Sequence, residues 1–285
     1  MDSSPVSRRL PGPALRIIAA GEIANKIVFK IVYYLAGWQI APMITARTSR
    51  KPPSRRPAVA PPIGLQPRAP SVADLIVRKL QEDIVLGRRH PRERLVEQDL
   101  GAAFDTHRGD VRLALFELEK MGIVERIPNR GAIVRDLKPR EVRAIYDVRE
   151  ELEVMAVRIL PFPVPPADIA RLEAVQHQHG KAVDAGDMLA VFHSNVQFHR
   201  ALFSLCGNIC LIETIEQLAQ KVSGIRSYAY VKPESLNEAR RDHIAMIKAL
   251  RASRRDQLIE LTRRHLKPAV TAYADAYRLR FGDGG

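Results

Sequence analysis

The stretch from Arg92 to Arg135, RERLVEQDLGAAFDTHRGDVRLALFELEKMGIVERIPNRGAIVR, constrains the fold more than any other part of the chain. Two of its segments carry apolar residues at near-helical spacing: Leu95, Leu100, Ala103 and Phe104, and then Val111, Leu115, Leu118 and Met121. Between them lies the short polar run Asp105-Thr106-His107, which suits a tight turn between two helices.

After Gly122 the apolar period changes. Ile123 to Ile127 indicates a strand, Pro128 to Gly131 a turn, and Ala132 to Val134 the returning strand. Helix, turn, helix and hairpin in this order predict a winged helix-turn-helix. Such a fold places its second helix in the major groove of DNA.

These residues resemble the DNA-binding domain of GntR-type bacterial transcription regulators over about residues 71–138, through RLVEQDL and VRLAL-x-x-LE-x-x-G-x-VER-x-PNRGA-x-V. The resemblance implies that Arg108 and Arg112 contact DNA at the start of the recognition helix. It also implies that Gln98 approaches a phosphate. His107-Arg108-Gly109-Asp110 stands where such regulators usually carry Ser-Arg-Thr-Pro, so we expect an operator different from the usual one.

Residue chemistry points the same way. Arg108 and Arg112 are four residues apart and therefore share one helix face, away from the apolar face. Guanidinium groups suit guanine edges or phosphates. At the predicted wing tip, Arg130 beside Gly131 suits a minor groove or a phosphate. We predict DNA contacts from Arg108, Arg112, Gln98, Arg130 and three neighbours, His107, Gly109 and Gly131; the alternative is a solvated charged face.

The net charge of +13 is unevenly distributed. Residues 1–70 carry 11 Lys and Arg against 2 Asp and Glu, whereas residues 71–138 carry 13 against 12 and residues 139–285 carry 21 against 18. The DNA-reading segment therefore works by placing charges rather than by accumulating them.

Residues 1–70 are expected to be a basic, Pro-rich extension, disordered or translated from a start upstream of the working one at Met43. Ile31 to Ala46 is uncharged but too short to span a bilayer. No short basic start leads into an apolar run, so a signal peptide is not expected. We expect a cytoplasmic protein with no membrane partner; a membrane-surface helix is the alternative.

Residues 139–280 predict an all-α bundle, followed by a tail at 281–285. The fold class is therefore mostly α, with a winged helix-turn-helix before a helical domain. Cys206 and Cys210 are interpreted as small core residues rather than a metal or redox pair. The predicted helices are 140–160, 167–185, 188–206, 209–228, 235–252 and 256–279.

The segments YDVREELE, F-H-x-x-L-x-x-x-x-GN, H-x-x-x-x-x-AL and RRHL resemble the FCD-type ligand-binding domain of the FadR branch of GntR regulators. His199, His243 and His265 fall on three predicted helices within matched segments, where neutral imidazoles can ligate a metal ion. Asn195 stands where many family members have aspartate, offering an oxygen without charge. The resemblance implies Zn²⁺ or Ni²⁺, with Arg149 placed to pair with an acidic effector.

The sequence thus favours a homodimeric regulator, a repressor by analogy, that binds a pseudo-palindromic operator and responds to a small carboxylate effector. The alternative is a metal-dependent hydrolase or lyase that uses the three histidines. Against an enzyme, the chain has no HExxH, no G-x-S-x-G and no phosphate-cradling Gly loop. Glu151 and Glu153 are candidate bases but are more simply a solvated helix face, and His177 and His179 are expected to be exposed.

Overall fold

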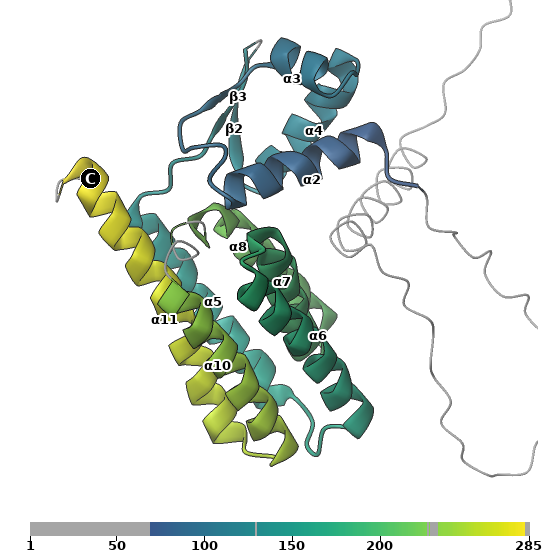
Figure 1. The fold of residues 1–285 in the computed structure, drawn as a ribbon, viewed down its shortest axis with the longest axis vertical. Helices are drawn as coiled ribbons and strands as arrows, with labels where there is room; N and C mark the ends of the chain where they lie inside the picture. Colours follow the sequence, from purple (N-terminus) through teal and green to yellow (C-terminus); the bar gives the residue numbers. More distant parts are fainter. Residues whose placement is uncertain (1–68, 129, 227, 229–232, 283–285) are drawn as a thin grey trace, which may run out of the picture. The chain divides into compact units, whose positions relative to one another are not determined.

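The computed structural model describes residues 69–282, apart from 129, 227 and 229–232 (Figure 1). The predicted extension at 1–70 therefore lies almost wholly outside the described residues. Three helices and a small sheet come first, and a bundle of long helices follows. In the first part the helices are α2 (Val72–Val85), α3 (Glu97–Ala103) and α4 (Arg108–Lys120).

Helix α2 begins where the sequence supplies a capping box. The Ser71 hydroxyl accepts from the Asp74 amide at 3.2 Å, and the Asp74 carboxylate accepts from the Ser71 amide at 2.9 Å. The buried face of α2, including Ile76, Leu80 and Ile84, packs against α4. The winged part thereby has a core of its own.

The sheet has three antiparallel strands in the order β1-β3-β2: β1 (Arg94–Leu95), β2 (Val124–Ile127) and β3 (Gly131–Val134). Strand β1 was not predicted, because two residues are too few to show an alternating pattern. Gly131, predicted to end the turn, opens β3 with a φ of 91°. A Cβ there would lie 2.1 Å from the Leu95 carbonyl oxygen, so this position requires glycine.

The second part is built from α5 (Pro139–Ile159), α6 (Pro166–Ala185), α7 (Met188–Ser204), α8 (Ile209–Lys221), α10 (Pro233–Arg251) and α11 (Arg255–Phe281). Helix α11 packs against both α5 and α10, and α6 packs against α7 and α10 (Figure 1). The mostly α fold with a winged helix-turn-helix and a helical domain is confirmed.

One helix ends earlier than predicted. The segment 209–228 is not a single helix, because α8 stops at Lys221 and a 3₁₀ turn, η1 (Ser223–Ile225), follows. Gly224 in this turn approaches α2 so closely that a Cβ would lie 3.2 Å from Ile84 Cγ2. Glycine is a poor helix former, and here its lack of a side chain allows η1 to contact α2.

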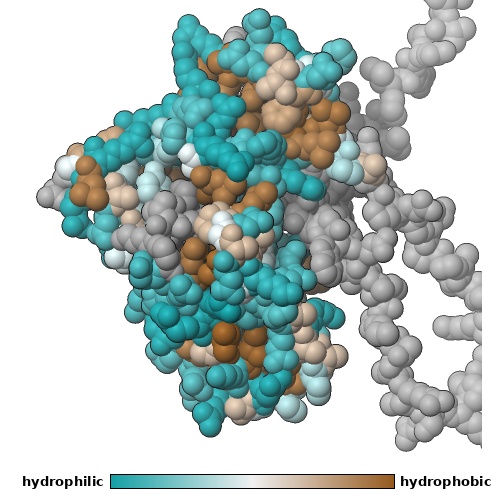
Figure 2. All heavy atoms as spheres, viewed as in Figure 1, coloured by the Kyte–Doolittle hydropathy of each residue, from teal (hydrophilic) through white to brown (hydrophobic). Residues whose placement is uncertain are grey.

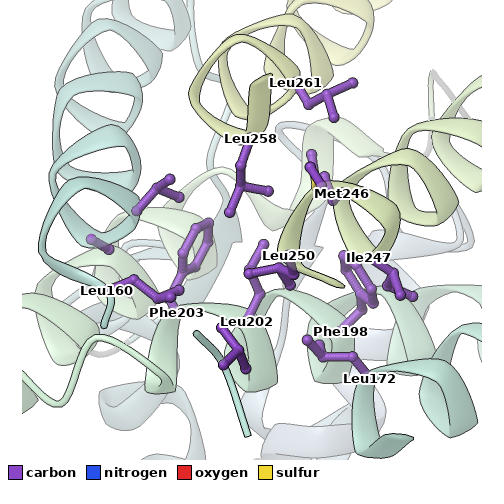
Figure 3. Packing of buried hydrophobic residues seen from close by; sticks show 14 of the residues in the cluster. Leu160, Leu172, Phe198, Leu202, Phe203, Met246, Ile247, Leu250, Leu258 and Leu261 are labelled. Atoms are coloured by element: carbon purple, nitrogen blue, oxygen red, sulfur yellow. The ribbon is translucent and has the colours of Figure 1, made fainter. Parts of the chain in front are cut away.

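Large apolar side chains from the helices of the second part meet in the bundle core (Figure 3). Phe198 and Leu202 of α7 and Leu250 of α10 are fully buried, and Leu258 of α11 packs with them. Full burial of such side chains stabilises a fold by roughly 1.5–3 kcal/mol each. Figure 2 shows mainly hydrophilic side chains on the viewed face, with small apolar patches between them.

Cys206 is half-buried as expected for a small packing residue, but Cys210 is exposed, so its interpretation as a core residue was wrong. Of the helices described, none is long and apolar enough to cross a membrane. The uncharged stretch Ile31 to Ala46 lies outside the described residues.

Candidate DNA-reading helix and metal-binding cavity

Helix α4 turns one face inward and one outward. Val111, Leu115 and Leu118 are buried, whereas Arg108 is exposed and the Arg112 side chain is 58% exposed. Arg112 Nε donates to Glu97 Oε2 of α3 at 2.9 Å. Such an exposed ion pair contributes about 0–1 kcal/mol. Glu97 therefore orients the Arg112 guanidinium but holds it too weakly to keep it from binding another anion.

The turn before α4 accounts for Asp110 but not for Gly109. Thr106 Oγ1 donates to Asp110 Oδ2 at 2.8 Å, so the Asp110 carboxylate is directed to the turn and lies in the favourable first turn of α4. Gly109 is exposed, and a Cβ there would meet nothing within 4 Å. No steric requirement therefore explains a glycine at this position.

The other predicted DNA-facing positions differ in exposure. Gln98, His107 and Arg130 are exposed, on α3, at the start of α4 and at the hairpin tip. Gly131 is buried, and its packing against Leu95 accounts for its identity.

In the helical domain, the predicted residues Arg149, Asn195, His199 and His265 line one cavity of about 90 Å³, together with three residues that were not predicted there: His179, Arg226 and Asp242. They come from α5, α6, α7, α10, α11 and the segment after η1. The remaining predicted residue, His243, is fully buried and stacks on Phe198, with ring centroids 3.9 Å apart.

Three histidines have the spacing of a ligand set. One nitrogen from each of His199, His243 and His265 lies within 4.8 Å of the other two, and the Nε2 atoms of His199 and His265 are 3.0 Å apart. Zinc–nitrogen bonds of about 2.0–2.1 Å at right or tetrahedral angles separate two ligand nitrogens by about 2.8–3.4 Å. The pair therefore already stands at the distance that one ion requires.

Two of the three outer nitrogens, those of His243 and His265, have neighbours, whereas His199 Nδ1 is buried without a hydrogen-bond partner among the described residues. His243 Nδ1 is 2.9 Å from Gln176 Oε1, which can only accept, so Nδ1 carries the hydrogen and Nε2 keeps its lone pair. His243 Nε2 has no hydrogen-bond partner among the described residues. His265 Nδ1 lies 3.5 Å from Asp242 Oδ2. Such outer contacts fix the tautomer of metal-binding histidines.

Burial sets the charge state of the cluster. Burial, followed by the nearby His265, lowers the pKa values of His199 and His243 well below the ordinary histidine value. Although burial opposes it, hydrogen bonds from His265 and Arg264 lower the pKa of Asp242. At neutral pH the two imidazoles are therefore neutral and the carboxyl is charged, as a divalent cation prefers. The residues fit a metal ion.

The expectation that His177 and His179 are exposed was wrong for His179, which is 1% exposed. Its Nδ1 lies 3.1 Å from Ser194 Oγ, whose own hydrogen goes to the Ala190 carbonyl oxygen at 2.6 Å. His179 Nδ1 is therefore the donor, and Nε2 is a lone pair without a partner in the described chain. Burial, then the His265 charge, lowers the pKa of His179 to about 4.

Arg149 is also more buried than a surface anchor. Its side chain is 5% exposed, and it donates to Glu153 Oε1 from Nε at 3.1 Å and from Nη2 at 2.7 Å. Glu153, interpreted as part of a solvated face, is 1% exposed. That interpretation was wrong. Because the Glu153 carboxylate is paired with Arg149, it is not free to act as a general base.

Arg226 was missed by the sequence reasoning because it lies in a segment predicted as uninterrupted helix. It follows η1 directly and lines the cavity. In the described part of the chain, Nη1 of Arg226 and Nη1 of Arg149 are both buried without hydrogen-bond partners. Two guanidinium groups with spare donors favour an anionic guest.

Two family models match the chain. Residues 73–134 match the model "Bacterial regulatory proteins, gntR family", and residues 144–268 match the FCD domain. The HTH-type transcriptional regulator McbR of Escherichia coli K12 is 27% identical over 175 residues, covering 61% of this chain and 79% of McbR. The HTH-type transcriptional repressor RspR of the same organism is 26% identical over 205 residues, covering 71% and 89%.

Solved structures show the same fold. E. coli McbR/YncC aligns with a TM-score of 0.64 at 23% identity, over 73% of this chain and 99% of that one. A putative GntR transcriptional regulator from Rhodococcus sp. RHA1 aligns with a TM-score of 0.58 at 24% identity, over 72% and 99%. The chain combines a GntR-type helix-turn-helix domain with an FCD domain, and its relatives are GntR-family transcriptional regulators.

Proposed function

We propose that this protein is a transcriptional repressor of the FadR branch, which binds a pseudo-palindromic operator as a homodimer. A small organic acid, held with Zn²⁺ or Ni²⁺ in the cavity, changes its affinity for DNA. The observation that carries the proposal is the outward face of α4, where Arg108 and Arg112 are exposed while the opposite face is buried. The names of the relatives support the regulatory role.

The DNA contacts divide by chemistry. Arg108 and Arg112 sit at the N-terminal end of α4, which is the end that reads bases in helix-turn-helix proteins. Gln98 and His107 lie beside them, and Arg130 is at the wing tip, where it suits a phosphate or the minor groove. Gly109 leaves room for close approach of the sugar-phosphate backbone.

The ligand site uses buried groups instead. His199, His243 and His265 hold the metal ion, with Asn195 beside them as a neutral oxygen donor. When bound, the ion supplies positive charge to a carboxylate. Arg149 and Arg226 supply the spare N–H groups that orient the acid. The lone pair on His179 Nε2 accepts from a hydroxyl of the ligand.

Binding reaches the DNA-reading domain through η1. Arg226 follows η1 directly, and Gly224 within η1 contacts Ile84 of α2, which packs on α4. A ligand that draws Arg226 toward the cavity shifts η1 and therefore α2. Allosteric couplings of this kind are typically 1–3 kcal/mol.

The function is tested by selecting DNA duplexes from a random pool with the purified protein. The affinity for the selected duplexes is then measured by fluorescence anisotropy. An inverted repeat is expected, and Arg112→Ala weakens binding to it. Arg171→Ala is the control, since Arg171 has a 69% exposed side chain far along the sequence on α6. A selection that returns no common sequence would overturn the proposal.

The coupling route has its own test. Gly224→Ala adds a Cβ that would lie 3.2 Å from Ile84 Cγ2, so it disturbs the contact between η1 and α2 directly. In this variant, the affinities for metal and for DNA, each measured alone, are expected to stay within about twofold of the wild-type values. The change in DNA affinity that the ligand causes is expected to be smaller than in the wild type. An undiminished response in this variant excludes the η1 route and leaves DNA binding untouched.

A further inference from the structure

Helices α6 and α10 pack side by side and leave a groove of about 420 Å³ between them. Each described residue that lines this groove belongs to one of the two helices, and none of them lines the cavity that contains His199 and His265. Small-molecule sites in proteins usually have volumes of about 300–1,000 Å³. The space, called the α6–α10 groove from here on, is therefore large enough for a ligand of its own.

An ion pair crosses the α6–α10 groove at each end. Arg240 Nη1 donates to Asp184 Oδ1 at 2.7 Å. At the other end, Arg251 Nη2 donates to Glu173 Oε1. The arginines are eleven residues apart on α10, the carboxylates are eleven apart on α6, and they pair in opposite order. The helices therefore run antiparallel, and the two ion pairs stand about 16 Å apart. Both carboxylates in the described lining of the groove are thus already paired.

Two more cations line the groove between these ion pairs. Lys181 of α6 and Lys248 of α10 are both exposed, and neither forms an ion pair with a residue that the structure describes. With the two arginines they give four cationic side chains against two carboxylates, a surplus that suits two negative charges. The pairing of the helices sets Lys181 and Lys248 about 7–8 Å apart along the groove, a distance that one small molecule with two anionic groups can span.

Between the lysines the groove is apolar. Ile247 is 6% exposed, and Ile244, one helical turn before it, is 39% exposed. On α6, Gly180 allows a close approach, because a Cβ there would lie 3.3 Å from the Arg240 guanidinium. Glycine is a poor helix former, so this contact accounts for its presence inside α6. The groove therefore suits a ligand that has an apolar part as well as its charges.

Gln176 adds a buried polar group to the groove. It lines the groove although only 6% of its surface is exposed. Its Oε1 accepts from His243 Nδ1 at 2.9 Å, whereas its amide nitrogen forms no hydrogen bond with a described residue. Buried polar groups in proteins are normally hydrogen-bonded. An oxygen of an anion in the groove supplies the acceptor that the Gln176 amide nitrogen lacks within the described chain.

We propose that the α6–α10 groove binds a small organic dianion with an apolar body, at a site separate from the metal cavity. Lys181 and Lys248 pair with its two negative charges. Ile244 and Ile247 contact its apolar part, and the Gln176 amide donates to one of its oxygens. Dicarboxylates and phosphate monoesters share this chemistry, and the first experiment distinguishes them.

A ligand in the groove also acts on His243 through Gln176. Hydrogen bonds in a chain polarise one another, so an anion that accepts from the amide makes Gln176 Oε1 a stronger acceptor for His243 Nδ1–H. Outer hydrogen bonds of this kind raise the basicity of a metal-binding histidine. The groove ligand is therefore expected to tighten metal binding, a consequence that rests on the proposed function. The experiments use metal-free protein without DNA, so a failure of the proposed function leaves their outcome unaffected.

The first experiment titrates adipate and phenyl phosphate into the full chain with chelator present, by saturation-transfer difference NMR. Binding of at least one probe is expected, and which one binds distinguishes carboxylate from phosphate ligands. Substituting both lysines, Lys181→Ala with Lys248→Ala, is expected to weaken binding by about threefold to thirtyfold, the size expected for two exposed ion pairs. Lys267→Ala removes an exposed lysine of α11 outside the groove and keeps the wild-type affinity.

Absence of binding by both probes, or an unchanged affinity in the double-lysine variant, would overturn the proposal. The second of these outcomes would assign the anion to the metal cavity instead. Ile244→Glu is an independent check at an exposed position of the groove. Its carboxylate repels the dianion, so binding is expected to be lost while the circular dichroism spectrum stays unchanged. Retained binding in Ile244→Glu would equally exclude the groove.

The second experiment follows the His243 Nδ1–H proton by NMR in ¹⁵N-labelled, metal-free protein, with its resonance assigned by its loss in His243→Gln. The bound probe is expected to move this resonance downfield, because a stronger hydrogen bond deshields its proton. His179 Nδ1–H, which donates to Ser194 outside the groove, is the control and is expected to move less. A probe that binds without moving the His243 resonance would overturn the contact with Gln176.

Discussion

Arg112 and Arg149 each donate to a glutamate, yet their side chains are 58% and 5% exposed. In the winged domain the glutamate partner steadies a charge that water still reaches, so the guanidinium is available to an incoming anion. In the helical domain the glutamate partner offsets the cost of burying the Arg149 charge. Nη1 of Arg149 has no hydrogen-bond partner in the described part of the chain. In the proposed function, one domain thus recognises a large partner with exposed groups, and the other recognises a small one with buried groups.

This contrast predicts that the largest stability effects belong to the buried site. His243→Ala is expected to abolish the rise in melting temperature that Zn²⁺ or Ni²⁺ gives the wild type. At a hundred times the dissociation constant, a ligand stabilises by about 2.7 kcal/mol, or roughly 5–10 °C at this size. His177→Ala, on the exposed side of α6, keeps the full rise in differential scanning fluorimetry. Equal rises in melting temperature in all three proteins would contradict the metal site.

At the exposed site the expected effect appears in binding. Arg112→Ala removes a side chain suited to a base contact of about 1–3 kcal/mol, which corresponds to roughly fivefold to hundredfold weaker operator binding. Its melting temperature changes by less than about 2 °C, because exposed ion pairs contribute about 0–1 kcal/mol. Anisotropy titrations beside Arg171→Ala measure the difference. A variant that loses stability rather than affinity would contradict the division between the two domains.

The pKa of His179 gives the buried site a dependence on pH. Its pKa is lowered from 6.5 to about 4, so between these values the unfolded chain takes up a proton that the folded chain refuses. His179 alone therefore makes the stability of the metal-free protein fall as pH drops below about 6.5, by on the order of 1–2 kcal/mol at pH 5. The buried His199 and His243, whose pKa values are also lowered, add to this fall.

Urea unfolding at pH 7 and pH 5, with chelator present, measures this loss. His179→Leu, of similar size and without a titrating group, is expected to lose less stability than the wild type over the same pH interval. His177→Leu serves as the control at an exposed position. An identical pH dependence in His179→Leu and wild type would show that His179 is not held neutral by burial.

The smallest effect is expected at Gly109, whose missing side chain no neighbour requires. Gly109→Ala adds a good helix former to the first turn of α4 and is expected to stabilise by about 0.5–1 kcal/mol. Operator affinity measured in parallel decides whether the glycine serves DNA approach. Weaker binding with higher stability supports that role; unchanged binding assigns Gly109 no part in recognition.

The sequence predicted the two helices and hairpin of the winged domain because their apolar periods are regular and their turn is polar. Strand β1 escaped prediction because Arg94 and Leu95 are too few to show a period. Its pairing is visible only through Gly131, whose identity depends on the Leu95 carbonyl oxygen beside it.

In the helical domain, the resemblance singled out His199, His243 and His265, and the structure brings them together. His179 was misjudged, although a signal was present: it continues the spacing of Leu172 and Gln176 along the buried face of α6. Arg226 offered no such signal, since its position depends on where α8 ends. Burial of Glu153 follows from its partner Arg149, which periodicity does not reveal.

The contact between Gly224 and Ile84 also has a consequence in the opposite direction. Coupling free energies are reciprocal, so under the proposed function the factor by which the ligand changes DNA affinity is also the factor by which the operator changes ligand affinity. Protein bound to its operator therefore responds to a different range of ligand concentrations than protein free in solution. The ligand level at which a gene responds is therefore set partly by the strength of its own operator, and operators of unequal strength give one regulator several thresholds.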